Sequence, residues 1–243
     1  PKLQQRPDLC YKNIAIEVQC SSLKFSRFLE RTNTYLANGY RPWWILGEKL
    51  HPKRQWSLLA KACCSYQATG FCLWLIDTQN QSLMKLEQIN WHYQEGVSSQ
   101  QSDARKGAPY HKETLRPLCK GKRSNHHRPP EWLAADYQVW LIQKLRKNLP
   151  KIRVIQEILY PLKGNVSQLP MWCYCASSFG ILFEHRILVF RFLYLSDCPL
   201  RFDQWVARLR QLDWQWQFPL LDQREILRGL FQECQYLENS VSF

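Results

Sequence analysis

Three polar residues near the start of the chain have the types and spacing that phosphodiester chemistry requires. Asp8 and Glu17 are carboxylates, and Gln19 follows Glu17 by two residues. Carboxylate oxygens are ligands that a hard cation such as Mg²⁺ prefers, and such an ion polarises a phosphate and lowers the pKa of bound water. A neighbouring amide can donate a hydrogen bond to the phosphate or to that water. Asp8 and Glu17 are therefore candidate metal ligands, and all three residues form a candidate catalytic set.

The pattern around these residues predicts a β-hairpin that brings the two acids together. Residues 14–19 read as a strand with Glu17 on the side away from its apolar face, and Lys12 and Asn13 suit a two-residue turn before it. With that turn, Asp8 faces Glu17, with Cβ atoms about 5 Å apart. Facing carboxylates repel each other, and a divalent cation offsets the repulsion. The alternative is an acidic residue on the solvated outer face of an edge hairpin.

The elements that follow predict a mixed α/β sheet. Residues 25–38 read as a helix whose inner stripe consists of Phe25, Phe28 or Leu29, Thr32 and Leu36, and Gly39 suits its left-handed C-cap. Residues 43–47 form a short apolar run typical of a strand buried on both faces. A helical crossover of this length usually makes its flanking strands parallel. Residues 71–76 and 83–89 predict a second hairpin around a polar turn.

Basic residues on and before this helix are candidate DNA contacts. Arg27, Arg31 and Tyr35 recur at intervals of four residues and so share one polar face of the predicted helix, and Lys24 precedes it. Such a face could bind a nucleic-acid backbone, with Lys24, Arg27 or Arg31 supplying positive charge near Gln19. The alternative is an ordinary solvated helix surface.

Composition excludes several classes of protein. The chain has 243 residues with a net charge of +13, and 45% of them are hydrophobic, so neither disorder nor a fibrous repeat fits. Its ten cysteines are too sparse for a disulfide miniprotein and form no C-x-x-C pair, so they are predicted to be reduced and mostly buried. The apolar run 179–195 contains charged residues, which favours a buried helix or strand pair over a membrane span. With no export signal visible, a soluble cytoplasmic protein is expected, and the missing initial Met suggests a fragment.

A basic segment divides the chain into two predicted domains. Residues 1–95 are expected to form the α/β core, residues 96–130 a basic linker or mobile loop, and residues 131–243 a helical domain with helices at 131–148, 202–212 and 222–236. Between residues 103 and 130 there are eight Lys or Arg against two acidic residues, so this segment can contact phosphates. The candidate DNA-binding residues within it are Arg105, Lys106, Lys120, Lys122 and Arg123. Most aromatic residues fall at periodic apolar positions and indicate core, although exposed rings can stack on bases.

The ordered motifs of the first fifty residues resemble the competence protein CoiA family. Pro7-Asp8 followed by Glu17-Val18-Gln19 is similar to the PD-(D/E)XK nuclease signature, with Gln in place of the usual Lys. The narrower resemblance adds further motifs, namely Gln5-Arg6-Pro7-Asp8, residues 14–21, Glu30-Arg31-Thr32, Tyr35 and Trp44-Ile45-Leu46-Gly47. This combination covers residues 5–47, and the later part of the chain supplies no sharp motif.

The resemblance implies a restriction-endonuclease-like core, a mixed sheet flanked by helices, and a helical C-terminal domain. It also implies a role in natural transformation, with Asp8 and Glu17 binding Mg²⁺ or Mn²⁺, Gln19 in the Lys position, and Arg31 and Tyr35 supporting them. The expected partners are DNA, expected to be single-stranded, and a recombinase or its loading factor. Two alternatives remain open, which are a catalytically inactive DNA-binding adaptor that assists recombinase loading and a restriction-type endonuclease acting on foreign duplex. The region that precedes the signature in the family, with a further acidic ligand, is not contained in this chain.

Overall fold

The computed structural model describes residues 5–67, 70–106, 132–196, 201–212 and 214–241. Its contacts divide the chain into two compact units. The sheet unit consists of residues Pro1–Ile89, Gly96–His127 and Gln217–Asp222, and the helical unit consists of Asn90–Glu95, Arg128–Trp216 and Gln223–Phe243. A membrane-spanning segment is not found among the described helices, because none combines the necessary length with sufficient apolar character.

The sheet unit is built on a mixed sheet, which confirms the predicted α/β class. The described strands are β1 (Leu9–Tyr11), β2 (Ile14–Gln19), β3 (Arg41–Gly47), β4 (Ser65–Gln67), β5 (Gly70–Asp77), β6 (Ser82–His92) and β7 (Gly96–Lys106). They are ordered β1-β2-β3-β5-β6-β7, and β4 pairs with β5. The β2–β3 and β3–β5 pairs are parallel, whereas β1–β2, β4–β5 and β5–β6 are antiparallel. The predicted parallel crossover from β2 to β3 is therefore confirmed.

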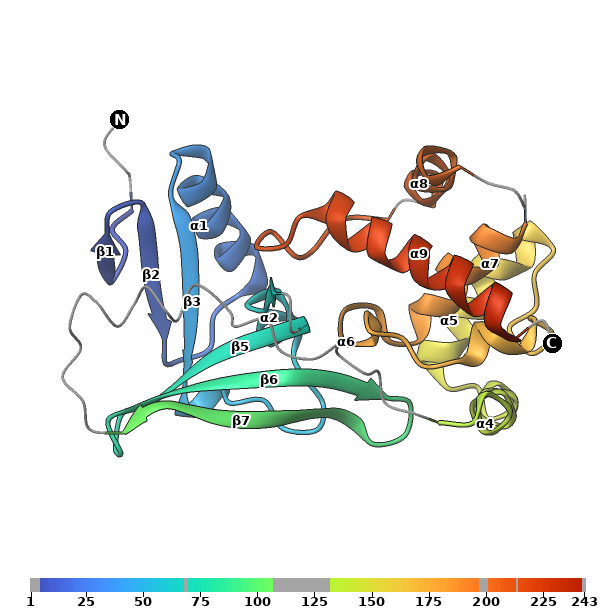
Figure 1. Cartoon of the computed structure of the whole chain (residues 1–243), viewed down its shortest axis with the longest axis horizontal. Helices are drawn as coiled ribbons and strands as arrows, with labels where there is room; N and C mark the ends of the chain where they lie inside the picture. Colours follow the sequence, from blue (N-terminus) through green and yellow to red (C-terminus); the bar gives the residue numbers. More distant parts are fainter. Residues whose placement is uncertain (1–4, 68–69, 107–131, 197–200, 213, 242–243) are drawn as a thin grey trace. The chain divides into compact units, whose positions relative to one another are not determined.

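Helix α1 (Phe25–Ala37) makes that crossover and covers one face of β2 and β3 (Figure 1). Its buried residues are Phe28, Thr32 and Tyr35. The ring of Phe28 lies 4.9 Å from that of Trp44, and the Trp44 indole donates a 3.0 Å hydrogen bond to the Thr32 hydroxyl. The prediction that Leu36 belongs to the inner stripe was wrong, because Leu36 is 44% exposed and the i, i+4, i+7 stripe ends on Tyr35. Gly39 has φ +77° beyond the helix end, as predicted for a left-handed cap.

The opposite face of the sheet carries a second apolar cluster. Ile16, Ile45, Trp74 and Leu83 form its buried centre, and Ile14, Trp43 and Ile76 pack against it while remaining partly exposed. Residues that pair across parallel strands share a face, so Trp43 and Ile16 lie here while Trp44 and Glu17 lie under α1. Two short helices, η1 (Glu48–Leu50) and α2 (Leu58–Ala62), link β3 to β4.

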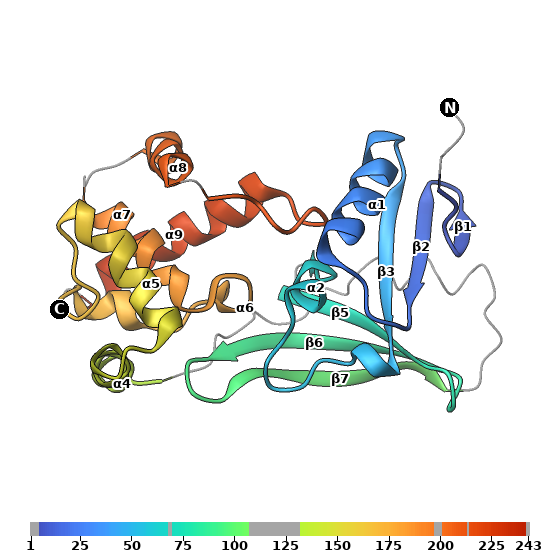
Figure 2. The same ribbon diagram turned by 180° about the vertical axis from the view of Figure 1, so that it is seen from behind.

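The long hairpin of β6 and β7 corrects the predicted linker. The β5–β6 hairpin is confirmed, but the chain then returns as β7 over Gly96–Lys106, where a loop was expected to begin (Figure 2). Gly96 has φ +82°, and an added Cβ would collide with the carbonyl oxygen of Arg54, which accepts a 2.8 Å hydrogen bond from the Val97 amide. Gly96 thus begins strand β7 directly after a turn and does not begin a linker, and polar Ser and Gln residues form the strand because β6 offers it a partner. The rest of the expected linker, residues 107–130, lies outside the described residues.

The helical unit contains six described α-helices. They are α4 (Ala134–Arg146), α5 (Pro150–Leu159), α6 (Gly180–Phe183), α7 (Ile187–Leu195), α8 (Phe202–Gln211) and α9 (Gln223–Val241), with short 3₁₀ helices η2 (Tyr160–Leu162), η3 (Met171–Tyr174) and η4 (Glu184–Arg186). The three predicted helices correspond to α4, α8 and α9. The apolar run 179–195 is helical, which settles the choice between helix and strand pair. Helix α5 is not among the predicted helices, because a proline after a helical pattern suggests its end, whereas Pro150 here begins the next helix.

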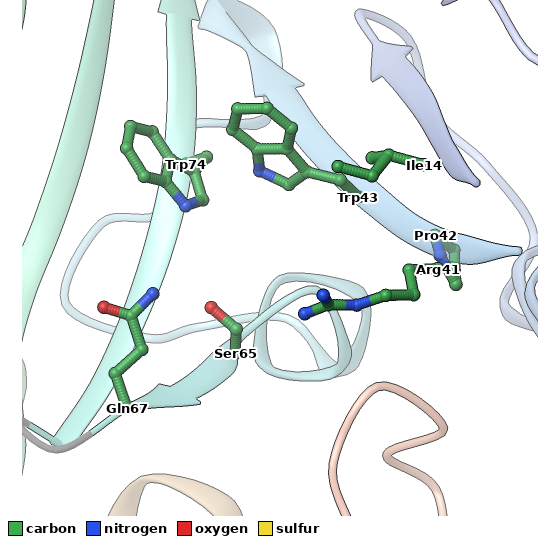
Figure 3. Close-up of a pocket in the computed structure, with 7 residues that line it drawn as sticks. All are labelled: Ile14, Arg41, Pro42, Trp43, Ser65, Gln67 and Trp74. Carbon is green, nitrogen blue, oxygen red and sulfur yellow. The ribbon is translucent and has the colours of Figure 1, made fainter. Parts of the chain in front are cut away.

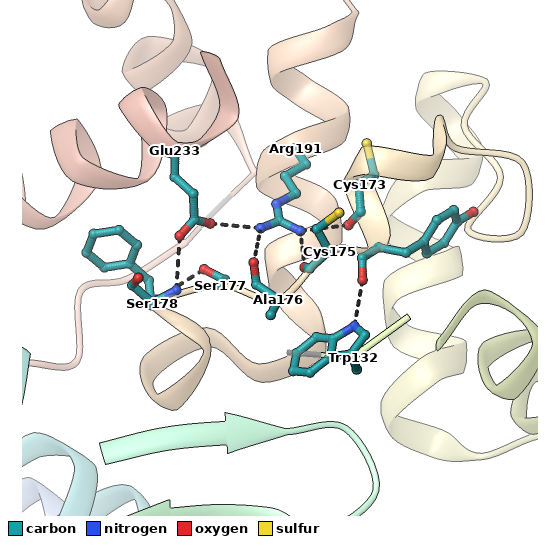
Figure 4. A network of polar contacts seen from close by, with 10 residues as sticks. Trp132, Cys173, Cys175, Ala176, Ser177, Ser178, Arg191 and Glu233 are labelled. Carbon is teal, nitrogen blue, oxygen red and sulfur yellow. Dashed lines mark hydrogen bonds and ion pairs between the residues drawn. The ribbon is translucent and has the colours of Figure 1, made fainter. Parts of the chain in front are cut away.

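A buried ion pair connects α7 to α9 in this unit (Figure 4). Arg191 is fully buried, and its guanidinium donates to Glu233 at 2.8 Å and to the carbonyl oxygens of Cys173, Cys175 and Ala176. The second oxygen of Glu233 accepts a 3.0 Å hydrogen bond from the Ser178 amide. The cysteines support the expectation of reduced thiols, since the eight described ones are unpaired and five of them are buried.

Candidate active site

The β1–β2 hairpin brings Asp8 and Glu17 to neighbouring strands. Leu9 pairs with Ile16 and Tyr11 with Ile14, which leaves the predicted two-residue turn at Lys12 and Asn13. The same register continued by one pair places Asp8 opposite Glu17. The Asp8 carboxylate is exposed, and its Oδ2 accepts a 2.8 Å hydrogen bond from the amide of Val18. The predicted turn and strand register are therefore confirmed for Leu9–Tyr11 and Ile14–Ile16.

Glu17 does not lie on a solvated outer face, as one alternative had it, but beneath helix α1. Only 1% of the residue is exposed. Arg31 Nη2 donates to both carboxylate oxygens, at 2.5 and 2.6 Å, and the hydroxyl of Tyr35 donates to Oε1. Arg31 and Tyr35 are four residues apart on α1, so one helical turn presents both donors to the same carboxylate. The helix thereby positions the side chain of Glu17.

The protonation behaviour of Glu17 reflects this enclosure. Burial raises its pKa above the usual value, the hydrogen bonds and charge of Tyr35 and Arg31 oppose that rise, and the charge of Asp8 adds to it. Burial disfavours the charged form, whereas a cation and hydrogen-bond donors favour it. Burial is thus the largest cause of the raised pKa of Glu17, and the charge of Asp8 is a smaller one.

We expect the phenol of Tyr35 to titrate far above an ordinary tyrosine. Burial, together with its hydrogen bond to Glu17, raises the pKa of Tyr35 from 10.0 to about 12. The stability that this group contributes should be complete below pH 10 and should be lost as the pH rises through about 12. The measurement is phenolate absorbance against pH for the wild type and for Tyr35→Phe. The step that disappears in the variant should have its midpoint near pH 12, and a lost step near pH 10 would contradict the burial argument.

Gln19, the third candidate catalytic residue, makes a local contact. It is half-buried on β2, and its Nε2 donates to the carbonyl oxygen of Ser21 at 2.7 Å. Its Oε1 remains an acceptor, so Gln19 can meet a water or a protonated group at this end of the strand. Sequence reasoning assigned no role to Gln5, whose Nε2 donates to the Arg31 carbonyl oxygen at 2.8 Å and ties the segment before Asp8 to α1. The Gln5-Arg6-Pro7-Asp8 motif was the available signal for that contact.

The predicted DNA-binding residues are distributed unevenly. Lys24 and Arg27 are exposed at the start of α1, and Arg27 pairs with Glu30 at 2.6 Å. Tyr35 is fully buried, so its prediction as a DNA contact was wrong, because the tyrosine turns inward with the core stripe of α1. Arg105 and Lys106 occupy the last two positions of β7. Lys120, Lys122 and Arg123 lie outside the described residues.

The donor set fits a hard divalent cation. Mg²⁺ is usually held by one or two carboxylates together with waters and substrate phosphates, and Asp8 and Glu17 supply one carboxylate each from the β1–β2 hairpin. Asp8 Oδ1 has no hydrogen-bond partner within the described residues, and Glu17 Oε2 accepts only from Arg31 there. The same residues contain no group of three or more His, Cys, Asp or Glu side chains arranged to hold a metal ion. Any ion at this site would therefore depend on phosphate and water for its other ligands.

Comparison with known proteins agrees with the resemblance noted in the sequence. No curated protein and no solved structure is significantly similar to the chain. Residues 1–120 match the family described as competence protein CoiA, nuclease-like domain. The matched range contains the β1–β2 hairpin, α1 and the Asp8–Glu17 site. Residues 1–120 of this chain therefore belong to the family of CoiA nuclease-like domains.

Proposed function

We propose that this chain handles incoming DNA during natural transformation and that Asp8 and Glu17 form a divalent-metal phosphodiesterase centre. The observation that carries the proposal is the hairpin register, which brings two carboxylates together inside a CoiA nuclease-like domain. A net charge of +13 favours binding to a polyanion and makes the affinity dependent on salt. Single-stranded DNA is the proposed substrate, and a recombinase or its loading factor is the proposed protein partner.

The residues of the chain have separate tasks in this proposal. Asp8 and Glu17 hold Mg²⁺ or Mn²⁺, which when bound polarises the phosphate and supplies an activated water. Arg31 and Tyr35 orient the Glu17 carboxylate and offset the cost of burying its charge. Gln19 orients a water through its side-chain carbonyl. Lys24 and Arg27, at the exposed start of α1, attract the DNA backbone.

A second candidate is a binding module that has lost the chemistry. Arg31 already neutralises Glu17, and Gln19 cannot supply the positive charge of the Lys that the nuclease signature usually has. A carboxylate paired with a guanidinium attracts a cation less than a free carboxylate does. In this case the protein would bind single-stranded DNA and deliver it to the recombination machinery without cutting it.

Cleavage assays with matched carboxylate variants separate the two candidates. The chain is incubated with end-labelled single-stranded and duplex DNA in Mg²⁺, in Mn²⁺ and in chelator. We expect metal-dependent cutting that falls at least about a hundredfold in Asp8→Asn and in Glu17→Gln, because each change removes one anionic ligand. Asp8 is exposed, so its variant should fold normally. Glu30→Gln, which removes an exposed carboxylate of α1, is the matched control and should keep full activity.

The outcomes assign the function. If the wild type cuts nothing with either metal yet retains single-stranded DNA in a binding assay, the binding module replaces the nuclease. Site-specific duplex fragments would instead indicate a restriction-type endonuclease. Absence of both cutting and binding would overturn the proposal of DNA handling.

A further inference from the structure

A pocket in the sheet unit opens on the face of the sheet that α1 does not cover (Figure 3). Its lining includes Ile14, Arg41, Trp43, Ser65, Gln67 and Trp74. Trp43 pairs in register with Ile16, and Trp44, its neighbour in β3, pairs with Glu17, so the pocket and the Asp8–Glu17 site use opposite faces of the same strands. The pocket is therefore distinct from the candidate active site.

Two indole rings form the apolar wall of this pocket. The rings of Trp43 and Trp74 meet edge to face, with centroids 5.3 Å apart and an interplanar angle of 78°. Trp74 belongs to the buried apolar cluster, which holds its ring in place, whereas Trp43 is only partly buried. The indole N–H of Trp43 is enclosed and has no hydrogen-bond partner within the described residues. The partly exposed ring of Trp43 is therefore the aromatic surface that the pocket offers to a ligand, with the buried ring of Trp74 beside it.

Polar and cationic groups lie opposite these rings. The Arg41 guanidinium extends along the pocket toward Ser65 in Figure 3, the residue is exposed, and it makes no ion pair with any described residue. The side-chain carbonyl oxygen of Gln67 accepts a 3.1 Å hydrogen bond from Lys85 Nζ. This contact fixes the orientation of the Gln67 side-chain amide. Lys85 Nζ also lies 5.7 Å from the centre of the Trp74 ring. The pocket thus combines aromatic surface, hydrogen-bonding groups and positive charge.

We propose that this pocket binds a nucleobase of single-stranded DNA, with Arg41 contacting an adjacent phosphate. A base has a flat π surface that can stack on the partly exposed ring of Trp43, and its phosphate complements the guanidinium. A base within a duplex is already stacked and paired, so the pocket selects the single strand. The inference rests on the proposed DNA-handling function and adds to it a binding site and a choice of strand.

The test compares oligonucleotides with and without bases. Binding of the chain to a labelled oligothymidylate and to an abasic strand of equal length is measured by anisotropy over a range of salt. We expect the wild type to bind the strand with bases about five- to a hundredfold more tightly, since base stacking contributes roughly that factor. Trp43→Leu keeps an apolar side chain but removes the ring, and should remove most of this preference without affecting binding of the abasic strand.

Arginine variants locate the phosphate contact. Arg41→Ala should lower the slope of log affinity against log salt by roughly 0.7, the value for one phosphate contact with a single strand. Arg54→Ala removes an exposed arginine that does not line the pocket and should change the slope less. Photo-cross-linking of a bromouracil oligonucleotide should label the peptides that contain Trp43 or Trp74.

The results test the base-binding pocket and the proposed DNA-handling function separately. DNA binding that depends neither on bases nor on Arg41, with cross-links elsewhere, overturns the pocket and leaves the proposed function intact. Loss of DNA binding altogether overturns both. Base-dependent binding that persists in Asp8→Asn supports the pocket independently of the catalytic centre.

Discussion

Arg191→Met is expected to lower the free energy of unfolding of the helical unit by about 3–5 kcal/mol, because it leaves a carboxylate without its cation in the interior. Arg191 is fully buried and donates to Glu233 and to three carbonyl oxygens between Cys173 and Ala176. Methionine fills similar volume but offers none of these hydrogen bonds. Within the described residues Glu233 would keep only the Ser178 amide, which donates to its second oxygen, and the three carbonyl oxygens would lose the guanidinium that they accept from.

Thiol labelling measures the loss of stability in the helical unit separately from the sheet unit. Cys173 and Cys234 are fully buried in the helical unit, and burial raises the pKa of Cys234 to about 12, so both should react only after local opening. Their labelling rates, resolved by peptide mass spectrometry, should rise roughly a hundredfold to a few thousandfold in Arg191→Met. Arg153→Ala removes an exposed arginine that pairs with Glu157 at 3.1 Å and should change these rates little.

Unchanged labelling of Cys173 and Cys234 in Arg191→Met would mean that the buried pair contributes no net stability. A small effect is expected only when both partners are replaced together, as in a double variant that also converts Glu233 to Gln, because no unpaired charge is then left. The single variant removes only the cation, so it tests the cost of the carboxylate that remains. Cys63, Cys64 and Cys72, which are buried in the sheet unit, report whether the effect spreads beyond the helical unit.

Local rules made the hairpin and the crossover predictable. A two-residue turn determines the pairing of the strands beside it, so the register of β1 and β2 followed from Lys12 and Asn13 alone. The parallel arrangement of β2 and β3 followed from the length of the helical connection. Strand β7 was not predictable by the same means, because its Ser and Gln residues have no strong strand preference and pair only because β6 lies beside them.

The sequence was sufficient to predict the two acidic residues of the candidate site, but not the residues that surround them. Alternation along β2 placed Glu17 on the face opposite Ile16, but it left open whether that face holds a metal site or is the solvated outer face of an edge hairpin. Its burial depends on where α1 docks, which is a tertiary contact that periodicity along one strand does not contain. The spacing of Arg31 and Tyr35 correctly predicted that they share a face of the helix. The same two residue types, however, suit a solvated helix surface as well as a pair of donors that bind a buried carboxylate. The Arg191–Glu233 pair is separated by 42 residues, and no local pattern joins them.

Arg31→Ala is expected to destabilise the sheet unit by about 3–5 kcal/mol at neutral pH, because it leaves Glu17 buried with Tyr35 as its only side-chain partner among the described residues. The measurement is the labelling of Cys63, Cys64 and Cys72, which should accelerate while Cys173 and Cys234 change little. Arg27→Ala, one turn earlier on α1, removes an exposed arginine that pairs with Glu30 at 2.6 Å and should cost no more than about 1 kcal/mol. Equal effects of the two variants would show that burial of Glu17 carries no electrostatic cost.

The pH dependence of Arg31→Ala distinguishes a lost charge partner from lost packing. The pKa of Glu17 already lies above its usual value of 4.5 because of burial, and removal of Arg31 takes away a group that lowers it. The folded variant therefore holds a proton on Glu17 more readily than the unfolded chain does, and its stability should fall as the pH rises from about 4.5 through the raised pKa. The deficit relative to the wild type should accordingly be smaller in acid than at neutral pH. The double variant Arg31→Ala, Glu17→Gln lacks the buried charge, so it should be more stable at neutral pH than Arg31→Ala alone, whereas a deficit caused by packing would persist in the double variant and at every pH.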